Sequence, residues 1–420
     1  MKKIFGIIIV VFLMINAFSS DLLSISKRNK WGYIDNTGKV VIKPEFKYAG
    51  DFVEGLAPVK FRNNKWGYID ETGKTVIEGK YLSATTFSEG FAIVQTASRG
   101  AAYNFIDKTD NLLLENNVGD AKRFSDGLAP VMIASGEWVY INNLGKKVIT
   151  NGEIGYFKSA GIFNEGIAAV FSEDGNALNN YHYAFIDKTG KEVITLDKST
   201  TMAIGSFSEG LAPVMINRKW GYYNLQGEIV IPAHYALAMP FKNGYAAAIY
   251  EPTDDYKGWT IIDKTGKPVF ERTFNRITTG YLGVYANTYR DIMNKVDNVA
   301  RNLNVRLTGG KSAFRSTGIM IIEPGMFGIH DFEFSEGYVP MIVKAIKAKY
   351  RGNIPAEVYA EMPKEPTEFY NYVDLKGEKL NNIQWTEAYP FKNGIAKVYT
   401  KKDTFGYIDN TGKYIWKPQK

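Results

Sequence analysis

The sequence of 420 residues contains no cysteine, which removes several kinds of chemistry at once. Without a thiol the chain can form no disulfide, thiolate metal site, cysteine nucleophile or lipid anchor through cysteine. Histidine is scarce as well: His182, His234 and His330 are the only three, and their scatter excludes zinc-site spacing. The Gly-x-Ser-x-Gly motif of many serine hydrolases is also absent. We therefore expect no metal, no cofactor and no enzyme activity.

Long hydrophobic runs are lacking too, apart from Ile4 to Ile15 near the start. A membrane-spanning helix needs about 20 apolar residues, and this run is shorter. It follows two lysines and precedes Ala17-Phe18-Ser19, which has small residues at the two positions that a signal peptidase reads. We predict a signal peptide over residues 1–19, cleaved after Ser19. The mature chain, 20–420, is then expected in the periplasm or outside the cell, without a transmembrane anchor.

What the sequence has in abundance is one repeated phrase, clearest in Trp31-Gly32-Tyr33-Ile34-Asp35-Asn36-Thr37-Gly38-Lys39. Most copies follow one another at steps of 35 to 45 residues. Self-similarity at such a period indicates a repeat architecture, in which each unit packs mainly on its neighbours. We number the units one to nine by the first residue of each copy: Trp31, Trp66, Tyr103, Trp138, Tyr183, Trp220, Trp259, Tyr370 and Phe405.

A second phrase recurs between these copies, as in Phe52-Val53-Glu54-Gly55-Leu56-Ala57-Pro58-Val59. Both phrases have the alternation and β-branched residues of strands, and Asp-Asn-Thr-Gly-Lys separates two strands as a hairpin turn with glycine at positive φ. In the third copy Asp110 stands in place of that glycine, a residue that also tolerates this backbone. The recurring Asp, Asn and Glu residues are thus predicted to be turn residues rather than catalytic carboxylates or calcium ligands.

Each unit is therefore predicted to be a three-stranded antiparallel meander, and the fold class is all-β. A lone meander leaves one face apolar, so the units must stack. Residues 22–26 supply a first strand before Trp31 and a hairpin ends near Lys417, so both ends resemble whole units. For this reason we favour an open twisted array of meanders over the alternative, a closed propeller-like ring.

The Trp-Gly pairs at Trp31, Trp66 and Trp220 give the chain a clear resemblance to bacterial WG-repeat proteins. The likeness covers nearly all of the mature chain. Tyr103, Trp138, Tyr183, Trp259 and Tyr370 depart from the pattern because no glycine follows them. The resemblance implies an all-β repeat protein with no common catalytic residues, acting as an interaction surface or scaffold.

Two insertions interrupt the regular spacing. Residues 271–318 split unit seven, and apolar residues at helical spacing predict an amphipathic helix from Tyr289 to Asn304. This segment has eight basic and three acidic residues, a net charge of +5. Residues 344–368 form a second long loop in the next unit. Long loops in a compact repeat are often functional or disordered.

The basic residues of these insertions are our candidate partner-binding residues. The simpler interpretation of a short charge cluster is a solvated face, while the functional one is contact with a partner. The candidates are Arg290, Lys295, Arg301, Arg306, Lys311, Arg315, Lys344, Lys347, Lys349 and Arg351.

We predict a non-enzymatic exported protein that presents a binding or scaffolding surface to a protein partner. An alternative is a module that binds an anionic polymer of the cell envelope; nucleic acid is the least expected polyanion. Carbohydrate binding would use aromatic residues outside the repeated phrases. A carboxylate-dependent hydrolase using Asp291, Asp297 and Glu323 is the least favoured function. The aromatic residues outside the phrases are Tyr281, Tyr285, Tyr289, Tyr350, Tyr359 and Trp385.

Overall fold

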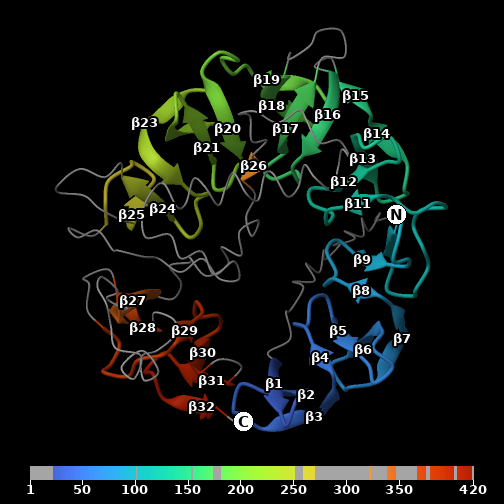
Figure 1. The fold of residues 1–420 in the computed structure, drawn as a ribbon, viewed down its shortest axis with the longest axis vertical. Coiled ribbons are helices and arrows are strands. Elements are labelled where there is room, and N and C mark those ends of the chain that lie inside the picture. Colours follow the sequence, from blue (N-terminus) through green and yellow to red (C-terminus); the bar gives the residue numbers. More distant parts are fainter. Residues whose placement is uncertain are drawn as a thin grey trace, which may run out of the picture.

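The repeated phrases form strands arranged as sheets around a ring (Figure 1). The computed structural model describes residues 22–100, 102–152, 155–173, 181–250, 259–269, 321–322, 338–346, 367–374, 379–401 and 404–418. Within these ranges all regular elements are β-strands, none is a helix, and no helix could span a membrane. The all-β class predicted from the sequence is therefore confirmed. The predicted helix from Tyr289 to Asn304 lies outside the described residues, as do the whole 271–318 insertion and most of the 344–368 loop.

Units one to three form separate small antiparallel sheets, whose strand orders follow the sequence. The strands are β1 (Leu23–Lys27), β2 (Lys30–Ile34) and β3 (Val40–Phe46); β4 (Tyr48–Ala49), β5 (Leu56–Lys60), β6 (Trp66–Asp70) and β7 (Thr75–Tyr81); and β8 (Ser83–Ala84), β9 (Ala92–Gln95) and β10 (Tyr103–Ile106).

Units four and five share a nine-stranded sheet. It holds β11 (Asp120–Ala121), β12 (Leu128–Met132), β13 (Trp138–Asn142), β14 (Lys147–Ile149), β15 (Asn151–Gly152), β16 (Gly155–Ala160), β17 (Ile167–Glu173), β18 (Tyr181–Asp187) and β19 (Glu192–Ile194).

Units six and seven share a seven-stranded sheet, and units eight and nine form the last two sheets. The pairing of β26 with β20 is parallel, and the other strand ladders are antiparallel. The strands are β20 (Thr201–Gly205), β21 (Leu211–Ile216), β22 (Lys219–Asn224), β23 (Ile229–Ala238), β24 (Tyr245–Tyr250), β25 (Trp259–Asp263) and β26 (Ile321–Ile322); β27 (Tyr338–Ile346) and β28 (Thr367–Asp374); and β29 (Glu387–Ala388), β30 (Ile395–Lys401), β31 (Thr404–Asp409) and β32 (Tyr414–Trp416).

The glycine of the Trp-Gly pair makes room for the outer strand of its unit. In unit two, Trp66 pairs with Tyr81 while Tyr68 pairs with Ile77, so the outer strand has two extra residues opposite Gly67. A side chain at Gly67 would clash with the backbone carbonyl of Ile77. The same clash would arise at Gly32, Gly221 and Gly406. The motif therefore marks a β-bulge that folds the outer strand over the middle one.

Asparagine replaces this glycine in two units and holds the following segment with its side chain. The amide nitrogen of Asn104 donates to the carbonyl oxygen of Leu114 at 2.9 Å. Asn371 donates in the same way to Asn381 at 2.8 Å and Ile383 at 2.6 Å. In these two units the asparagine side chain therefore holds the following segment by hydrogen bonds, whereas in the Trp-Gly units the outer strand lies directly against the glycine.

The hairpin turns have the predicted geometry. In unit one Gly38 has φ of 86°, and its N–H donates to the carbonyl of Asp35 at 3.0 Å. The Asp35 carboxylate accepts hydrogen bonds from the Thr37 hydroxyl and from the N–H groups of Thr37 and Lys39. Asp110, in place of the glycine, has φ of 72°, so the third turn survives as predicted. The recurring aspartates are therefore turn residues.

Each hydrophobic cluster is built from two neighbouring units. The first joins Tyr33, Ile42 and Phe46 of unit one to residues such as Phe52 and Ile69 of unit two. The rings of Tyr33 and Phe52 lie 4.7 Å apart, and the Tyr33 hydroxyl donates to the carbonyl of Gly50 at 2.7 Å. No unit therefore completes its core without a neighbour, as the stacking argument requires.

The first and last units are neighbours in this same way. Ile25 and Ile34 of unit one form one buried cluster with Phe405 and Tyr407 of unit nine. The Tyr407 hydroxyl donates to the carbonyl of Ser24 at 2.9 Å. Figure 1 shows β32 beside β1 to β3. The open array that we favoured is wrong at this point, because the two ends meet to form a seam.

We expect Gly67→Ala to lower the free energy of unfolding by about 1–3 kcal/mol, the usual cost of overpacking, because its Cβ would meet the carbonyl of Ile77. Gly55→Ala is the control, since its Cβ would meet no atom within 4 Å and it changes only a left-handed backbone position. Urea unfolding of both variants measures the difference. Equal losses would contradict the steric role of Gly67.

Acid should destabilise the protein through the turn aspartates. In Asp70 the hydroxyl of Thr72, followed by the N–H groups of Lys74 and Thr72, lowers the pKa of the carboxyl. In Asp107 partial burial opposes the shift, but hydrogen bonds from Asn111 and Thr109 lower the pKa to about 2. Because the folded pKa is depressed, this stabilisation is present above about pH 4 and lost as the pH falls toward the folded pKa.

We therefore expect Asp107→Asn to reduce the loss of thermal stability between pH 7 and pH 3. Asparagine is accepted at this position, because Asn142 and Asn224 occupy it in other units and accept the same backbone bonds. Melting curves at both pH values give the comparison. An undiminished loss in the variant would show that Asp107 does not contribute.

Candidate interaction surface

The predicted basic candidates cannot be located in the described part of the chain, with one exception. Lys344 lies in β27, opposite Phe369 of β28. The other nine lie outside the described residues, and so do Asp291, Asp297 and Glu323 of the hydrolase hypothesis. Among the aromatic candidates only Trp385 is described, and it is fully buried with its indole N–H donating to the Tyr414 hydroxyl at 3.1 Å. Trp385 is therefore a core residue and not a carbohydrate contact.

In five of the second phrases an acidic residue links its unit to the next one. Glu54 has φ of 54°, and its carboxylate accepts a hydrogen bond from the N–H of Gly90 in the following unit at 3.1 Å. Five such bonds connect units two to seven in succession. The remaining four run to Glu89 from Gly127, to Asp126 from Gly166, to Glu165 from Gly210 and to Glu209 from Gly244.

Two lysines reinforce this row of carboxylates. Lys108 of the unit three turn lies 3.2 Å from the carboxylate of Glu54 and donates to its carbonyl at 2.9 Å. Lys264 of the unit seven turn contacts Glu209 in the same way, at 3.1 Å and 3.2 Å. These acids are turn residues, as predicted from the sequence, but the links that they make between units were not predicted. The regular spacing of the acids along the sequence was the signal from which these links could have been predicted.

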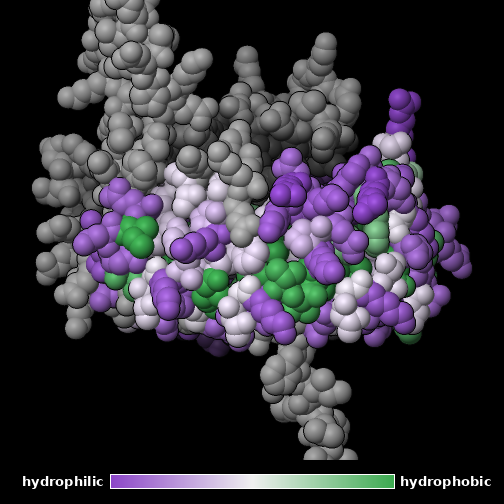
Figure 2. All heavy atoms as spheres, turned by 90° about the horizontal axis from the view of Figure 1, so that it is seen from below, coloured by the Kyte–Doolittle hydropathy of each residue, from purple (hydrophilic) through white to green (hydrophobic). Residues whose placement is uncertain are grey.

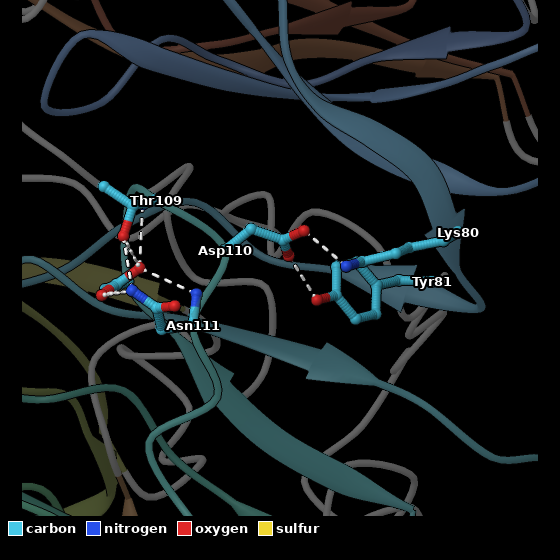
Figure 3. Close-up of polar contacts among 6 residues, drawn as sticks. Lys80, Tyr81, Thr109, Asp110 and Asn111 are labelled. Carbon is cyan, nitrogen blue, oxygen red and sulfur yellow. Dashed lines mark hydrogen bonds and ion pairs between the residues drawn. The ribbon is translucent and has the colours of Figure 1, made fainter.

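The turn of unit three contributes a further contact through Asp110. Its carboxylate accepts a hydrogen bond from the Tyr81 hydroxyl at 2.6 Å and pairs with Lys80, both at the end of β7 in unit two. Figure 3 shows Asp110 directed toward these two side chains and away from Thr109 and Asn111. In unit six the hydroxyl of Tyr235 bonds the carbonyl of Gly266 instead. Asp110 thus replaces a backbone acceptor with a carboxylate between units.

One cluster has the residue types of a catalytic triad. Ser172 lies 3.2 Å from Nδ1 of His182, whose Nε2 is 4.0 Å from Glu192. Ser172 is fully buried and His182 is 6% exposed. The serine oxygen is also nearly equidistant from both ring nitrogens, with 3.4 Å to Nε2. A buried hydroxyl in this arrangement can reach no substrate, so the cluster serves the pairing of β17 with β18.

Aromatic rings from units nine, one and two form a continuous strip across the seam. Successive ring centroids lie 5.9, 5.4, 5.6, 5.0 and 5.4 Å apart. Phe405 is buried, Tyr48 is 46% exposed and the others are half-buried. In spatial order the strip consists of Tyr389, Tyr399, Phe405, Trp31, Tyr48 and Trp66.

A lysine sits within this aromatic strip. Nζ of Lys397 lies 4.1 Å from the ring centroid of Phe405, 5.4 Å from that of Tyr399 and 5.8 Å from that of Trp31. Burial lowers the pKa of its ammonium group, while the charges of Asp51 and Glu387 oppose the shift. Aromatic faces attract a cation, but they do not replace its full hydration.

Sequence reasoning missed Lys397, although a signal was present. The second phrase reads Leu-Ala-Pro-Val at Leu56, Leu128 and Leu211, and Ile-Ala-Lys-Val at Ile395. Pro58 pairs with Tyr68 as Lys397 pairs with Tyr407, so the lysine stands where other units have proline. A charge at a position that is apolar in other units indicates a local role rather than a repeat requirement.

The outer strands of the described units carry a different kind of apolar surface. Exposed apolar residues there come singly or in pairs from outer strands, such as Val40 and Val41 of β3 and Val76 of β7. In Figure 2, which views this edge, apolar patches are separated by polar side chains. Scattered exposed apolar residues of this kind are normal for a protein surface. The aromatic strip is therefore the candidate interaction surface.

Comparison with known families agrees with these features. Residues 31–66, 66–97, 183–220 and 220–249 match the model of the WG containing repeat. These four segments of the chain are therefore WG repeats. The predicted resemblance is thereby confirmed, and the Trp-Gly bulge is the structural basis of the motif. No curated protein matches the sequence.

Solved structures resemble this chain over almost its whole length. A eukaryotic initiation factor aligns with a TM-score of 0.52 and 9% identity, covering 96% of this chain and 98% of the other. The computationally designed protein Ika8 aligns with a TM-score of 0.40 and 12% identity, over 95% and 96% of the two chains. AztD from Citrobacter koseri aligns with a TM-score of 0.35 and 10% identity, over 94% and 92%. The likeness to the initiation factor concerns the fold alone.

We expect Glu165→Ala to lower the free energy of unfolding by about 1–2 kcal/mol, because the N–H of Gly210 would lose its acceptor in the neighbouring unit. Glu71→Ala in an exposed hairpin turn is the control and should stay within about 0.5 kcal/mol of the parent. Denaturant titration of the two variants provides the test. A loss confined to Glu71→Ala would contradict the linking role.

Lys397→Met should instead raise thermal stability at pH 7, because methionine fills a similar volume among the rings without a charge that resists burial. The lowered lysine pKa has the matching sign: the cost applies below the folded pKa and fades as the pH rises through it. Lys74→Met, in an exposed turn, is the control. A lower melting temperature for Lys397→Met would mean that the cation–π contacts outweigh desolvation.

Proposed function

We propose that this protein is a non-enzymatic scaffold that binds a protein partner through the aromatic strip at its seam. Tyrosine and tryptophan are enriched where proteins bind one another, because each combines a large apolar surface with a polar group. The strip joins five tyrosine or tryptophan rings and Phe405, and Lys397 lies over four of these six rings. The exposed carboxylates of Asp51 and Glu387 act electrostatically on this lysine. This arrangement is the observation that carries the proposal.

The roles of the polar residues that recur within the repeat support a scaffold over an enzyme. The turn aspartates hold hairpins, and the acids of the second phrase bond to the next unit. In the Ser172, His182 and Glu192 cluster the serine and histidine are buried, and the carboxylate is partly exposed. Each of these groups is already engaged in structure, which favours a binding role. The signal peptide predicted over residues 1–19 is our reason for proposing a site of action outside the cytoplasm.

An anionic envelope polymer is the second candidate partner. Lys397 supports it, since a half-buried cation beside aromatic rings can meet an acidic group while the rings stack on apolar faces. The net charge favours it as well: it is +7 for the whole sequence, and +5 once Lys2 and Lys3 leave with the predicted signal peptide. The basic residues of the 271–318 and 344–368 insertions would add to this attraction.

To test the scaffold proposal, a photo-crosslinking amino acid replaces Tyr48 in the strip or Val41 on the outer edge, and the protein is irradiated in its host cells. We expect a discrete protein adduct from position 48 only, reduced when Lys397 is also changed to glutamate. Equal labelling at both positions, or none at position 48, would contradict the proposal.

Co-sedimentation with isolated envelope polymer at low and moderate salt tests the second candidate. The parent protein, Lys397→Met and a variant lacking 271–318 are compared. Binding that weakens with salt and in either variant would support the polymer, because exposed charge contacts are screened. Absence of binding at both salt concentrations would reject it.

A further inference from the structure

Lys397 occupies a strand position at which the other units carry no charge. It pairs with Tyr407 of the middle strand β31. The residues that pair with the same position of the middle strand in the other eight units are all uncharged, so the repeat does not need an ammonium group there. They are Ser24, Pro58, Ile93, Pro130, Ala169, Pro213, Ala247 and Pro340.

A neighbouring residue differs together with Lys397. The N–H of Gly50 donates to the carbonyl of Pro58 at 2.9 Å, and the N–H of Tyr389 donates to the carbonyl of Lys397 at the same distance. A Cβ at Gly50 would lie 2.8 Å from Cγ of Pro58. In unit nine both residues are exchanged, and Nζ of Lys397 lies 6.0 Å from the ring centroid of Tyr389. The cation and its ring are therefore particular to this one contact between units.

The ammonium group of Lys397 forms neither a hydrogen bond nor an ion pair with the described part of the chain. Its side chain is half-buried, and the groups around Nζ are aromatic rings. An aromatic face attracts a cation but does not replace the acceptors that an ammonium group needs for its three N–H donors. Three lysines at other contacts between units do pair with a carboxylate. These pairs are Lys80–Asp110, Lys108–Glu54 and Lys264–Glu209.

The charges around Lys397 limit the kind of anion that it can accept. The exposed carboxylates of Asp51 and Glu387 act electrostatically on this lysine without pairing with it. An incoming anion is attracted by one cation and repelled by two carboxylates, so a phosphate group or a densely charged polymer is disfavoured. A single carboxylate carries one negative charge and has two oxygens that accept ammonium N–H groups. It is therefore the anion that matches this site best.

Aromatic rings continue along the strip on both sides of Lys397. Tyr389 and Tyr399 lie on one side, while Trp31 and Tyr48 follow on the other. Tyr48 is 46% exposed. A carboxylate at Lys397 would thus have apolar contact surface on either side of it. This suits an acidic side chain within a segment of a partner, because the residues before and after the acid can pack on the rings.

We propose that Lys397 binds the carboxylate of an aspartate or glutamate side chain in the protein partner, with neighbouring apolar residues of the partner packed on Trp31 and Tyr48. This inference rests on the proposed function, since it takes the aromatic strip as the surface that the partner contacts. Lys397 then selects which segment of the partner is bound, and the rings supply the contact area.

The first test uses the adduct formed by a photo-crosslinking residue at position 48. Mass spectrometry of the digested adduct identifies the crosslinked segment of the partner. We expect an aspartate or glutamate within about four residues of the crosslink, the reach of an extended chain from Tyr48 past Trp31 to Lys397. An adduct without an acidic residue there would overturn this inference and leave the scaffold proposal standing. Absence of any adduct would overturn both.

The second test is a double-mutant cycle with a synthetic peptide of the crosslinked segment. Fluorescence anisotropy measures its Kd for the exported protein. Changing the acid of the peptide to its amide should weaken binding to the parent about tenfold, because a charge-assisted hydrogen bond is lost. With Lys397→Met the same change should matter less than about twofold.

Lys60→Met is the matched control for this cycle. Lys60 pairs with Tyr48 and Trp66 in the ladders of unit two, so the variant removes an equal charge beside the strip. It should keep the tenfold preference for the acidic peptide. An equal preference in the parent and in Lys397→Met would overturn the contact, and so would failure of the parent to bind the acidic peptide.

Discussion

Contact between one unit and the next is the interaction on which this structure depends. A three-stranded meander has too little interior to bury its aromatic residues alone. Here an aromatic residue of the middle strand is covered by a phenylalanine from the following unit in seven units. Where that residue is a tyrosine, its hydroxyl finds a carbonyl acceptor in the following unit. The seam between units nine and one extends the same logic to the two ends of the described chain, through Tyr407 and Ser24. Stability is therefore a property of the assembled array and not of any single unit.

The polar residues of the repeat follow from this constraint. Bringing successive turns together places backbone N–H groups at every contact, and these groups need acceptors. Glu54 and its counterparts supply carboxylates at positive φ, where the side chain reaches the next turn. Asp110 provides a variation in which a carboxylate bonds Tyr81 where a glycine carbonyl serves in another unit. The recurring acidic residues could be mistaken for catalytic carboxylates, but they accept hydrogen bonds that hold neighbouring units together.

Lys397 differs from these polar residues, because the repeat does not require a charge at its position. Proline or an apolar residue would satisfy the strand at this position, whereas a half-buried ammonium group is costly to desolvate. The surrounding rings offset part of this cost. A residue that lowers stability at a partly exposed aromatic surface is typical of a binding site, where function and stability make opposite demands.

Sequence alone determined the repeat, its strands and its turns, because these depend on local periodicity and on backbone preferences of glycine, aspartate and asparagine. The Trp-Gly pair and the Asp-x-Thr-Gly turn were readable for this reason. It did not determine that the ends meet, because the angle between successive units is set by side-chain packing summed around the ring. Nor did it bring Trp31, Tyr48 and Phe405 together around Lys397. Those residues come from opposite ends of the chain, and only the tertiary structure decides which distant segments become neighbours.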